Sequence, residues 1–153
     1  MQVANITRIH GSLDDALLLS MNQALHGCEN LGEARVLVSD FSKVNEVKLS
    51  SLTVRKVAAR DAVLSCKIPG IDLAMVTSNR SLYAMLRMYQ MIMESGQWRV
   101  RLFDNLEEME AWLDTFKPIE IAECRTGPVP ADALDAGELP EHDWIDQSGA
   151  LSS

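Results

Sequence analysis

The sequence has little of several features that mark large classes of protein. Aromatic residues make up only 5% of the 153 residues, so a hydrophobic core has to be built mainly from aliphatic side chains and methionine. No apolar run approaches the length of a membrane span, and we therefore expect no stable membrane insertion. The net charge is −8, which argues against a nucleic-acid partner, because proteins that bind nucleic acid carry basic surfaces.

The cysteines and histidines are too few and too scattered to predict a shared site. Cys28, Cys66 and Cys124 form no CxxC pair, and the 3 histidines show no HExxH spacing. We therefore expect no disulfide framework, no metal and no other cofactor, with free thiols that suit a reducing compartment. The first residues, MQVANITRIHGS, lack the apolar core of a signal peptide, so the sequence predicts a cytoplasmic protein.

Motifs for catalysis and for phosphate binding are also absent from the sequence. Neither GxGxxG nor a P-loop pattern occurs among the 8 glycines, and there is no GxSxG nucleophile elbow. The acid pairs at residues 14–15 and 107–108 fall in the first turns of expected helices, where the helix dipole accounts for them. The sequence offers no catalytic residue, and we interpret the protein as non-enzymatic.

The sequence does contain a regular alternation of strand and helix signals. Apolar runs and alternating patterns predict strands over residues 3–10, 34–41, 71–76 and 98–103. Apolar residues at helical spacing, preceded by capping residues, predict helices over residues 13–26, 51–65, 80–94 and 106–113. This order predicts an α/β fold, an open sheet of about four to five strands with four helices packed on it.

The helix over residues 51–65 has one face that we expect to point inward. Its members are apolar, and they are Leu52, Val54, Val57, Ala58, Ala62 and Val63. Asp61 falls among the charged residues that we expect on the outer face. Ser50 directly precedes the helix and has the side chain of a helix N-cap.

The chain changes character after residue 117. Residues 118–153 contain four of the 5 prolines, eight acids and one base, so they carry −7 of the net charge of −8. The sequence predicts one domain over residues 1–117 and an extended acidic tail over residues 118–153 that adds no regular element. Trp144 and Ile145 resemble a short docking segment within this tail, although a tail that stays in solvent is the simpler interpretation.

Four arginines supply positive charge that complements the tail. Arg80 and Arg87 share one face of an expected helix, and Arg99 and Arg101 share one face of an expected strand. These arginines indicate either a solvated basic surface or a site for an anion, an acidic partner or the tail itself.

Methionine is frequent, and five of the 8 methionines lie within residues 75–93. Thioether side chains fill irregular core space, and they also suit an apolar groove that accepts varied ligands. If the methionines only fill core space, they need have no function beyond packing. The second interpretation predicts a pocket for a small apolar, lipid-like ligand beneath the helix, lined by Met75, Met85, Leu86, Tyr89 and Met93.

Two segments carry a resemblance to a known family. The segment VLVSDFSKVNEVKLSSLTV resembles the strand, loop and helix start of STAS domains. Residues 11–13 and the segment FDNLEEMEAWL are similar to the bacterial SpoIIAA-like branch, also described as STAS/SEC14-like. The resemblance covers residues 5–116 and implies a STAS-like sheet. It also implies a regulatory module that binds a protein partner, including a second copy of the chain.

The resemblance places a partner surface on the loop after the second strand. Ser42 lies in the D-F-S phrase, and Ser50 and Ser51 open the following helix. Phosphorylation of Ser50 or Ser51 would add charge there and alter partner contacts. The phosphoacceptor pattern of the family, Asp-Ser before Gly, is however absent from residues 48–52, and N-capping alone accounts for Ser50.

The sequence therefore leads to two expectations of different kinds. The first is a non-enzymatic regulatory module that acts through protein–protein contacts. The alternative is a carrier or sensor of a small apolar ligand, suggested by the methionines and by the SEC14-like resemblance. The α/β fold does not choose between them, because one fold serves many functions.

Overall fold

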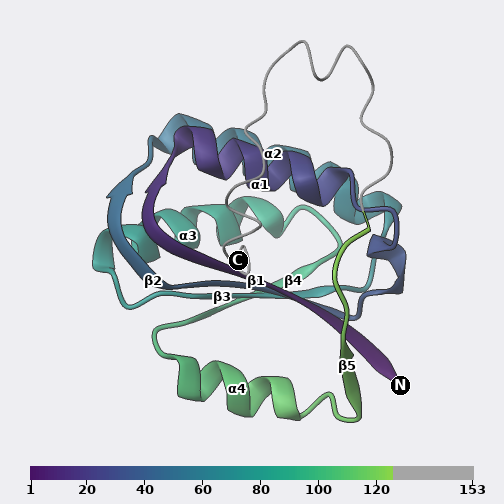
Figure 1. Ribbon diagram of the computed structural model, residues 1–153. Helices are drawn as coiled ribbons and strands as arrows, with labels where there is room; N and C mark the ends of the chain where they lie inside the picture. The colour runs from purple at the N-terminus through teal and green to yellow at the C-terminus, as the bar shows by residue number, and fades with distance from the viewer. Residues whose placement is uncertain (126–153) are drawn as a thin grey trace.

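A parallel sheet of five strands forms the centre of the structure, a computed structural model that describes residues 1–125 (Figure 1). The strands are β1 (Gln2–Asp14), β2 (Val36–Lys48), β3 (Asp72–Val76), β4 (Arg99–Phe103) and β5 (Ile119–Ile121). They lie in the order β4-β3-β2-β1-β5, and every neighbouring pair is parallel. The predicted α/β class and a sheet of about this size are confirmed.

Four α-helices cover the two faces of the sheet. Helices α1 (Asp15–His26), α2 (Ser51–Lys67) and α3 (Arg80–Met93) lie on one face, and α4 (Leu106–Asp114) lies alone on the other (Figure 1). A short 3-10 turn, η1 (Leu31–Glu33), follows α1. Within residues 1–125, no helix combines the length and the apolar character that crossing a bilayer requires.

Each of these four helices begins at a side-chain cap. The side-chain oxygens of Asp14, Ser50, Asn79 and Asn105 accept hydrogen bonds from the backbone N–H three residues further on. Such caps satisfy N–H groups that have no partner inside the helix, and each stabilises by about 0.5–2 kcal/mol. The predicted starts of α2 and α3 are therefore exact, whereas α1 begins two residues later than predicted.

Strands β1 and β2 are both longer than predicted. The sequence suggested that Gly11 ends the first strand, but Gly11 adopts a φ of 78° within β1 and the strand continues to Asp14. The register with β2 shifts between Arg8 and His10 and again between Gly11 and Ser12. Such irregularities bend a strand without ending it. The two strands curl together out of the sheet and lead into α1 and α2 (Figure 1).

Alternate residues of the central strands contribute to two hydrophobic cores. On the face covered by α1, α2 and α3, the strands contribute Leu37, Phe41, Leu73 and Met75. On the face covered by α4, they contribute Val36, Val38, Ala74 and Val76. Both faces of a parallel sheet are buried in this way, which explains why these strands are continuous apolar runs in the sequence.

The prediction that nothing regular follows residue 117 is wrong. Strand β5 adds to the outer edge of β1, with Gln2 opposite Ile119 and Ala4 opposite Ile121. A strand of three residues is too short to give a periodic signal, and the surrounding acids and prolines concealed it. The predicted docking of Trp144 and Ile145 lies outside the described residues.

The prediction of three free thiols is wrong for two of them. Cys28 and Cys124 form a disulfide, with their Cα atoms 5.2 Å apart and a separation of 96 positions in the sequence. Strand β5 carries Cys124 past the edge of β1 to the loop that follows α1, a juxtaposition that sequence spacing does not reveal. Cys66 is a free, exposed thiol. The argument for a reducing compartment is thereby removed, and the cytoplasmic location stays a prediction.

Candidate functional site: an apolar pocket beneath three helices

A pocket of about 720 Å³ lies between the sheet and the three helices that cover its first face. The sheet contributes Leu37, Phe41, Leu73 and Met75, and the helices contribute Leu18, Met21, Leu25, Val54, Val57, Leu82 and Leu86. We call this cavity the central pocket. Protein interiors are normally packed without voids much larger than a water molecule, and this space is instead a pocket that is partly open to solvent.

The central pocket is open on the side of β1. Its lining residues from α3 and β3, such as Leu82 and Met75, are buried. The exposed members of the lining, Arg8, Ile121 and Glu123, lie instead on β1 and on the segment that runs from β5 to the disulfide. The pocket therefore runs from the outer edge of the sheet into the core.

A buried carboxylate on α2 ties the three helices together at the pocket. Asp61 accepts hydrogen bonds from Asn22 Nδ2 of α1 at 2.7 Å and from the Tyr89 hydroxyl of α3 at 2.6 Å. His26 Nε2 lies 2.9 Å from the same carboxylate. Burial and the neighbouring Asp61 together raise the pKa of Tyr89 well above 10.0, so this phenol stays a hydrogen-bond donor. Asp61, Asn22 and Tyr89 all line the pocket.

Hydroxyl groups also face the pocket from the sheet. Thr7 of β1 and Ser39 of β2 are opposite each other in the parallel register, and both are half-buried and line the pocket. Strand alternation places Ser39 on the same face as Leu37 and Phe41, which belong to the core under the helices. A mostly apolar cavity thus offers hydrogen-bonding groups at two places, the hydroxyl pair and the Asp61 cluster.

The sequence pointed to part of this pocket. Met75, Leu86 and Tyr89 line it, as the apolar-pocket interpretation expected. Met85 is half-buried and packs against the core without lining the pocket. Met93 faces a separate, shallow groove at the β4 edge.

The structure corrects the predicted faces of α2, and this correction matters for the pocket. Asp61, expected outside, is only 3% exposed, whereas Leu52 and Val63, expected inside, are 70% and 59% exposed. Asp61 is four residues from Val57 and seven from Val54, both buried, so helical spacing alone placed it on the inner stripe. The charge of Asp61 favours the outer face, but its hydrogen-bond partners on α1 and α3 allow it to be buried.

The three serines of the predicted partner surface have different surroundings. Ser42 Oγ is buried, and it is the one buried side-chain polar atom within residues 1–125 that lacks a hydrogen-bond partner. The Ser50 hydroxyl donates to the Asp15 carboxylate at 2.9 Å, and the Ser50 N–H donates to it at 2.8 Å. The backbone hydrogen bond from Ser50 is the main cause that lowers the pKa of Asp15. Ser51 is exposed at the first position of α2.

The four arginines are not brought together. Arg80 and Arg87 are exposed on α3, on the first face of the sheet. Arg101 pairs with Ala74 in the strand register and lies over the Trp112 ring at 5.8 Å, on the face covered by α4. A single basic surface made of all four is therefore absent from this arrangement.

Arg99 instead belongs to an ion cluster at the start of β3. Asp72 is 2% exposed, and it accepts hydrogen bonds from Arg99 Nε at 2.8 Å and from Arg35. Burial acts to raise the pKa of Asp72, but the hydrogen bonds and charges of the two arginines outweigh it and leave the pKa lowered. This cluster accounts for Arg99 without a ligand.

Within residues 1–125, no three histidine, cysteine, aspartate or glutamate side chains converge in a way that would hold a metal ion. Comparison with known proteins gives no further guide, because no family model, no curated protein and no solved structure matches the chain. The resemblance to the SpoIIAA-like branch of STAS domains stays a prediction.

Proposed function

We propose that the protein is a non-enzymatic carrier or sensor that binds a small apolar ligand in the central pocket. The observation that carries this proposal is the central pocket itself, which has a volume of about 720 Å³ and reaches from the sheet edge into an aliphatic core. Ligand pockets of proteins commonly have volumes of about 300–1,000 Å³ and are lined mainly by apolar side chains. Burial of an apolar ligand here contributes about 25 cal/mol for each Å² removed from water.

The polar lining narrows the chemical class of this ligand. Thr7 with Ser39 offers hydroxyls, and the Asp61 cluster offers a carboxylate that favours a donor. A plain hydrocarbon would displace water from the Thr7 and Ser39 hydroxyls without replacing its hydrogen bonds, which is unfavourable. The Asp61 carboxylate, by contrast, already accepts from Asn22 and Tyr89. An anionic head group near Asp61 would be repelled. The ligand is therefore an apolar molecule with an uncharged hydrogen-bonding group, such as an alcohol or an amide.

A pocket-filling substitution tests this function. Ala24 lines the pocket from α1, and Ala24→Phe places a ring in it, whereas Ala16→Phe puts the same ring on an exposed position of the same helix. We expect Ala24→Phe to weaken binding of the neutral fluorophore N-phenyl-naphthylamine by about tenfold or more, equivalent to about 1.4 kcal/mol. Ala16→Phe should bind as the unchanged protein does. Equal affinities in the two variants would place the binding elsewhere and overturn the proposal.

Competition with related ligands tests the proposed chemical class. Decanol, decanoate and decane share one apolar chain and differ at its end. We expect decanol to displace the fluorophore at the lowest concentration, because only decanol pairs with the hydroxyls without bringing a negative charge. Displacement by decanoate at the same concentration or below would refute the argument from Asp61. Native mass spectrometry of the protein purified from cells then identifies whether a ligand of this class is carried.

A second candidate is the regulatory module that the STAS resemblance implies. One observation favours it: Leu52, beside Ser51 at the start of α2, is 70% exposed, as large apolar side chains at protein contacts often are. If a second copy of the chain contacts this residue, the protein forms a dimer, and Leu52→Asp should abolish that dimer. Arg55→Asp, at an exposed position of the same helix, is the control and should leave the dimer intact. Analytical ultracentrifugation measures this directly. A monomer at every concentration removes the second copy as the partner.

A further inference from the structure

The segment after α4 forms one side of the opening of the central pocket. We call residues 119–125 the strap, and residues 121–124 line the pocket. Past β5, the Ala122 N–H donates to the Ala4 carbonyl at 2.9 Å, and Asn5 Nδ2 donates to the Ala122 carbonyl at 2.9 Å. The strap therefore follows the outer edge of β1 and then rises toward the end of α1 (Figure 1).

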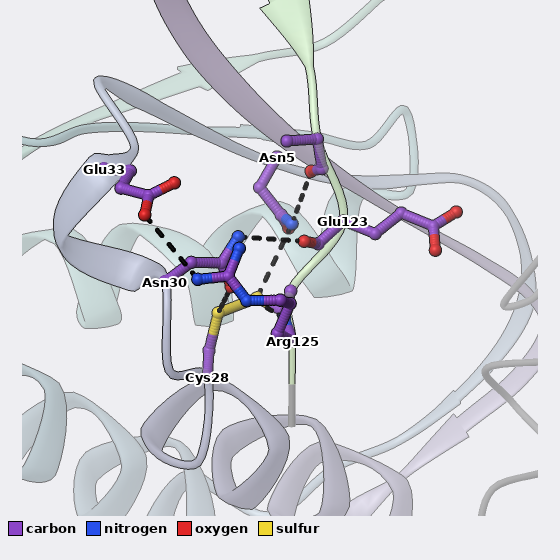
Figure 2. The surroundings of a disulfide bond; sticks show 8 residues. Asn5, Cys28, Asn30, Glu33, Glu123 and Arg125 are labelled. Atoms are coloured by element: carbon purple, nitrogen blue, oxygen red, sulfur yellow. Dashed lines mark hydrogen bonds and ion pairs between the residues drawn. A yellow bond between two sulfur atoms is a disulfide. The ribbon is translucent and has the colours of Figure 1, made fainter. Parts of the chain in front are cut away.

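The opposite side of the pocket is formed by α1. Met21, Ala24 and Leu25 of this helix line the pocket, and Cys28 lies two residues after the helix ends at His26. The disulfide between Cys28 and Cys124 therefore joins the helix that covers the pocket to the strap that borders its opening (Figure 2). No other covalent bond crosses between these two segments within residues 1–125.

The remaining contacts at this place are hydrogen bonds, an ion pair and the packing of Cys124 against the hydrophobic core. The Asn30 side chain donates to the Glu123 carbonyl at 3.1 Å and accepts from the Arg125 N–H at 2.6 Å (Figure 2). The Glu29 N–H donates to the Arg125 carbonyl at 2.7 Å. Arg125 also pairs with Glu33 at 3.6 Å, but both side chains are more than 60% exposed, and exposed pairs contribute little. Without the disulfide, the end of the strap is held by these few hydrogen bonds, two of them to the buried Asn30, and by the packing of Cys124.

We propose that the disulfide between Cys28 and Cys124 is a redox-controlled latch on the central pocket. This inference rests on the proposed function, because the latch controls exchange of the ligand that the pocket binds. In the oxidised protein, the strap stays joined to α1 and the ligand exchanges slowly. In the reduced protein, the strap separates from α1 by local opening, and the ligand enters and leaves faster.

The chemical step of the latch is a thiol–disulfide exchange with a dithiol reductant. The dithiol supplies two electrons and two protons, and its own two thiols become a disulfide. The bond between Cys28 and Cys124 is replaced by two thiols. The reverse exchange, with a disulfide oxidant, closes the latch again. Burial of Cys28, which is 9% exposed, means that the half-buried Cys124 sulfur is the one that an attacking thiolate reaches more easily.

The rate of ligand release tests the latch. The full chain carrying Cys66→Ser is used throughout, because this substitution removes the exposed free thiol and leaves the disulfide unchanged. Release of bound N-phenyl-naphthylamine is followed by stopped-flow fluorescence before and after treatment with dithiothreitol, with the thiols counted by mass spectrometry. We expect release to be about tenfold faster after reduction, since a native cross-link opposes separation of the two segments that it joins.

Two variants separate loss of the latch from other effects of the reductant. Cys124→Ser and Cys28→Ser, each in the Cys66→Ser background, should release the probe at the fast rate whether or not dithiothreitol is present. Equal release rates in the oxidised and reduced protein overturn the latch and leave the proposed function standing. Two free thiols at Cys28 and Cys124 in the air-oxidised protein also overturn the latch. Absence of probe binding in both redox states overturns the proposed function itself.

Discussion

Replacement of Asp61 by alanine tests the claim that one buried carboxylate holds three helices together. The substitution leaves the Asn22 amide and the Tyr89 hydroxyl without their acceptor, and these residues are only 5% and 6% exposed. An unsatisfied buried donor costs about 1–3 kcal/mol, so two such donors lower the free energy of unfolding by about 2–6 kcal/mol. Both donors border the central pocket, where water can enter, and this favours the lower half of that range.

Urea unfolding followed by circular dichroism measures this loss. Arg60→Ala is the matched control, because Arg60 is the exposed neighbour of Asp61 on the same helix and should change stability by less than about 0.5 kcal/mol. A double-mutant cycle with Tyr89→Phe should give a coupling energy of about 0.5–3 kcal/mol. If Asp61→Ala is no more destabilising than Arg60→Ala, or if the cycle shows no coupling, the hydrogen-bonded cluster does not hold the helices.

Two smaller predictions concern Tyr89 and the cap of α2. The raised pKa of Tyr89 means that the folded state holds this proton more tightly than the unfolded chain does. The contribution of Tyr89 to the free energy of unfolding is therefore fully present below pH 10.0 and falls as the pH rises above that value. Urea midpoints measured from pH 9 to 11 should therefore fall less in Tyr89→Phe than in the unchanged protein, and equal slopes would contradict the assignment. Ser50→Ala removes the cap of α2 and the hydroxyl bond to Asp15, while the backbone N–H bond to Asp15 is kept. It should lower stability by about 1 kcal/mol, whereas Ser51→Ala should have no measurable effect; similar losses in the two variants would refute the capping role.

The elements that the sequence predicted well are those with strong local signals. Helix α3 was predicted over residues 80–94 and is observed at Arg80–Met93, because its apolar stripe and the Asn79 cap both act within a few residues. Strand β3 is similarly a short, continuous apolar run that a central strand requires. In both cases, the interactions that form the element connect residues close in sequence, and a single pattern contains them.

The candidate site was predicted only in part. Met75, Leu86 and Tyr89 were found because an apolar stripe reports which face of an element is buried. The polar residues of the site were missed, since a buried carboxylate such as Asp61 is tolerated only when its partners are in place. Those partners, Asn22 and Tyr89, come from two other helices, and their distance from Asp61 depends on how the helices pack.

The sequence by itself determined the alternation of strands and helices from β1 to α4, the caps of α2, α3 and α4 and the α/β class, because all of these depend on periodicity and on hydrogen bonds within a few residues. Only the tertiary structure decided the rest. It added β5 to the edge of β1, joined Cys28 to Cys124 across 96 residues and left a pocket between the helices and the sheet. These features arise from contacts between segments far apart in the chain, and no local pattern of residues records how such segments meet.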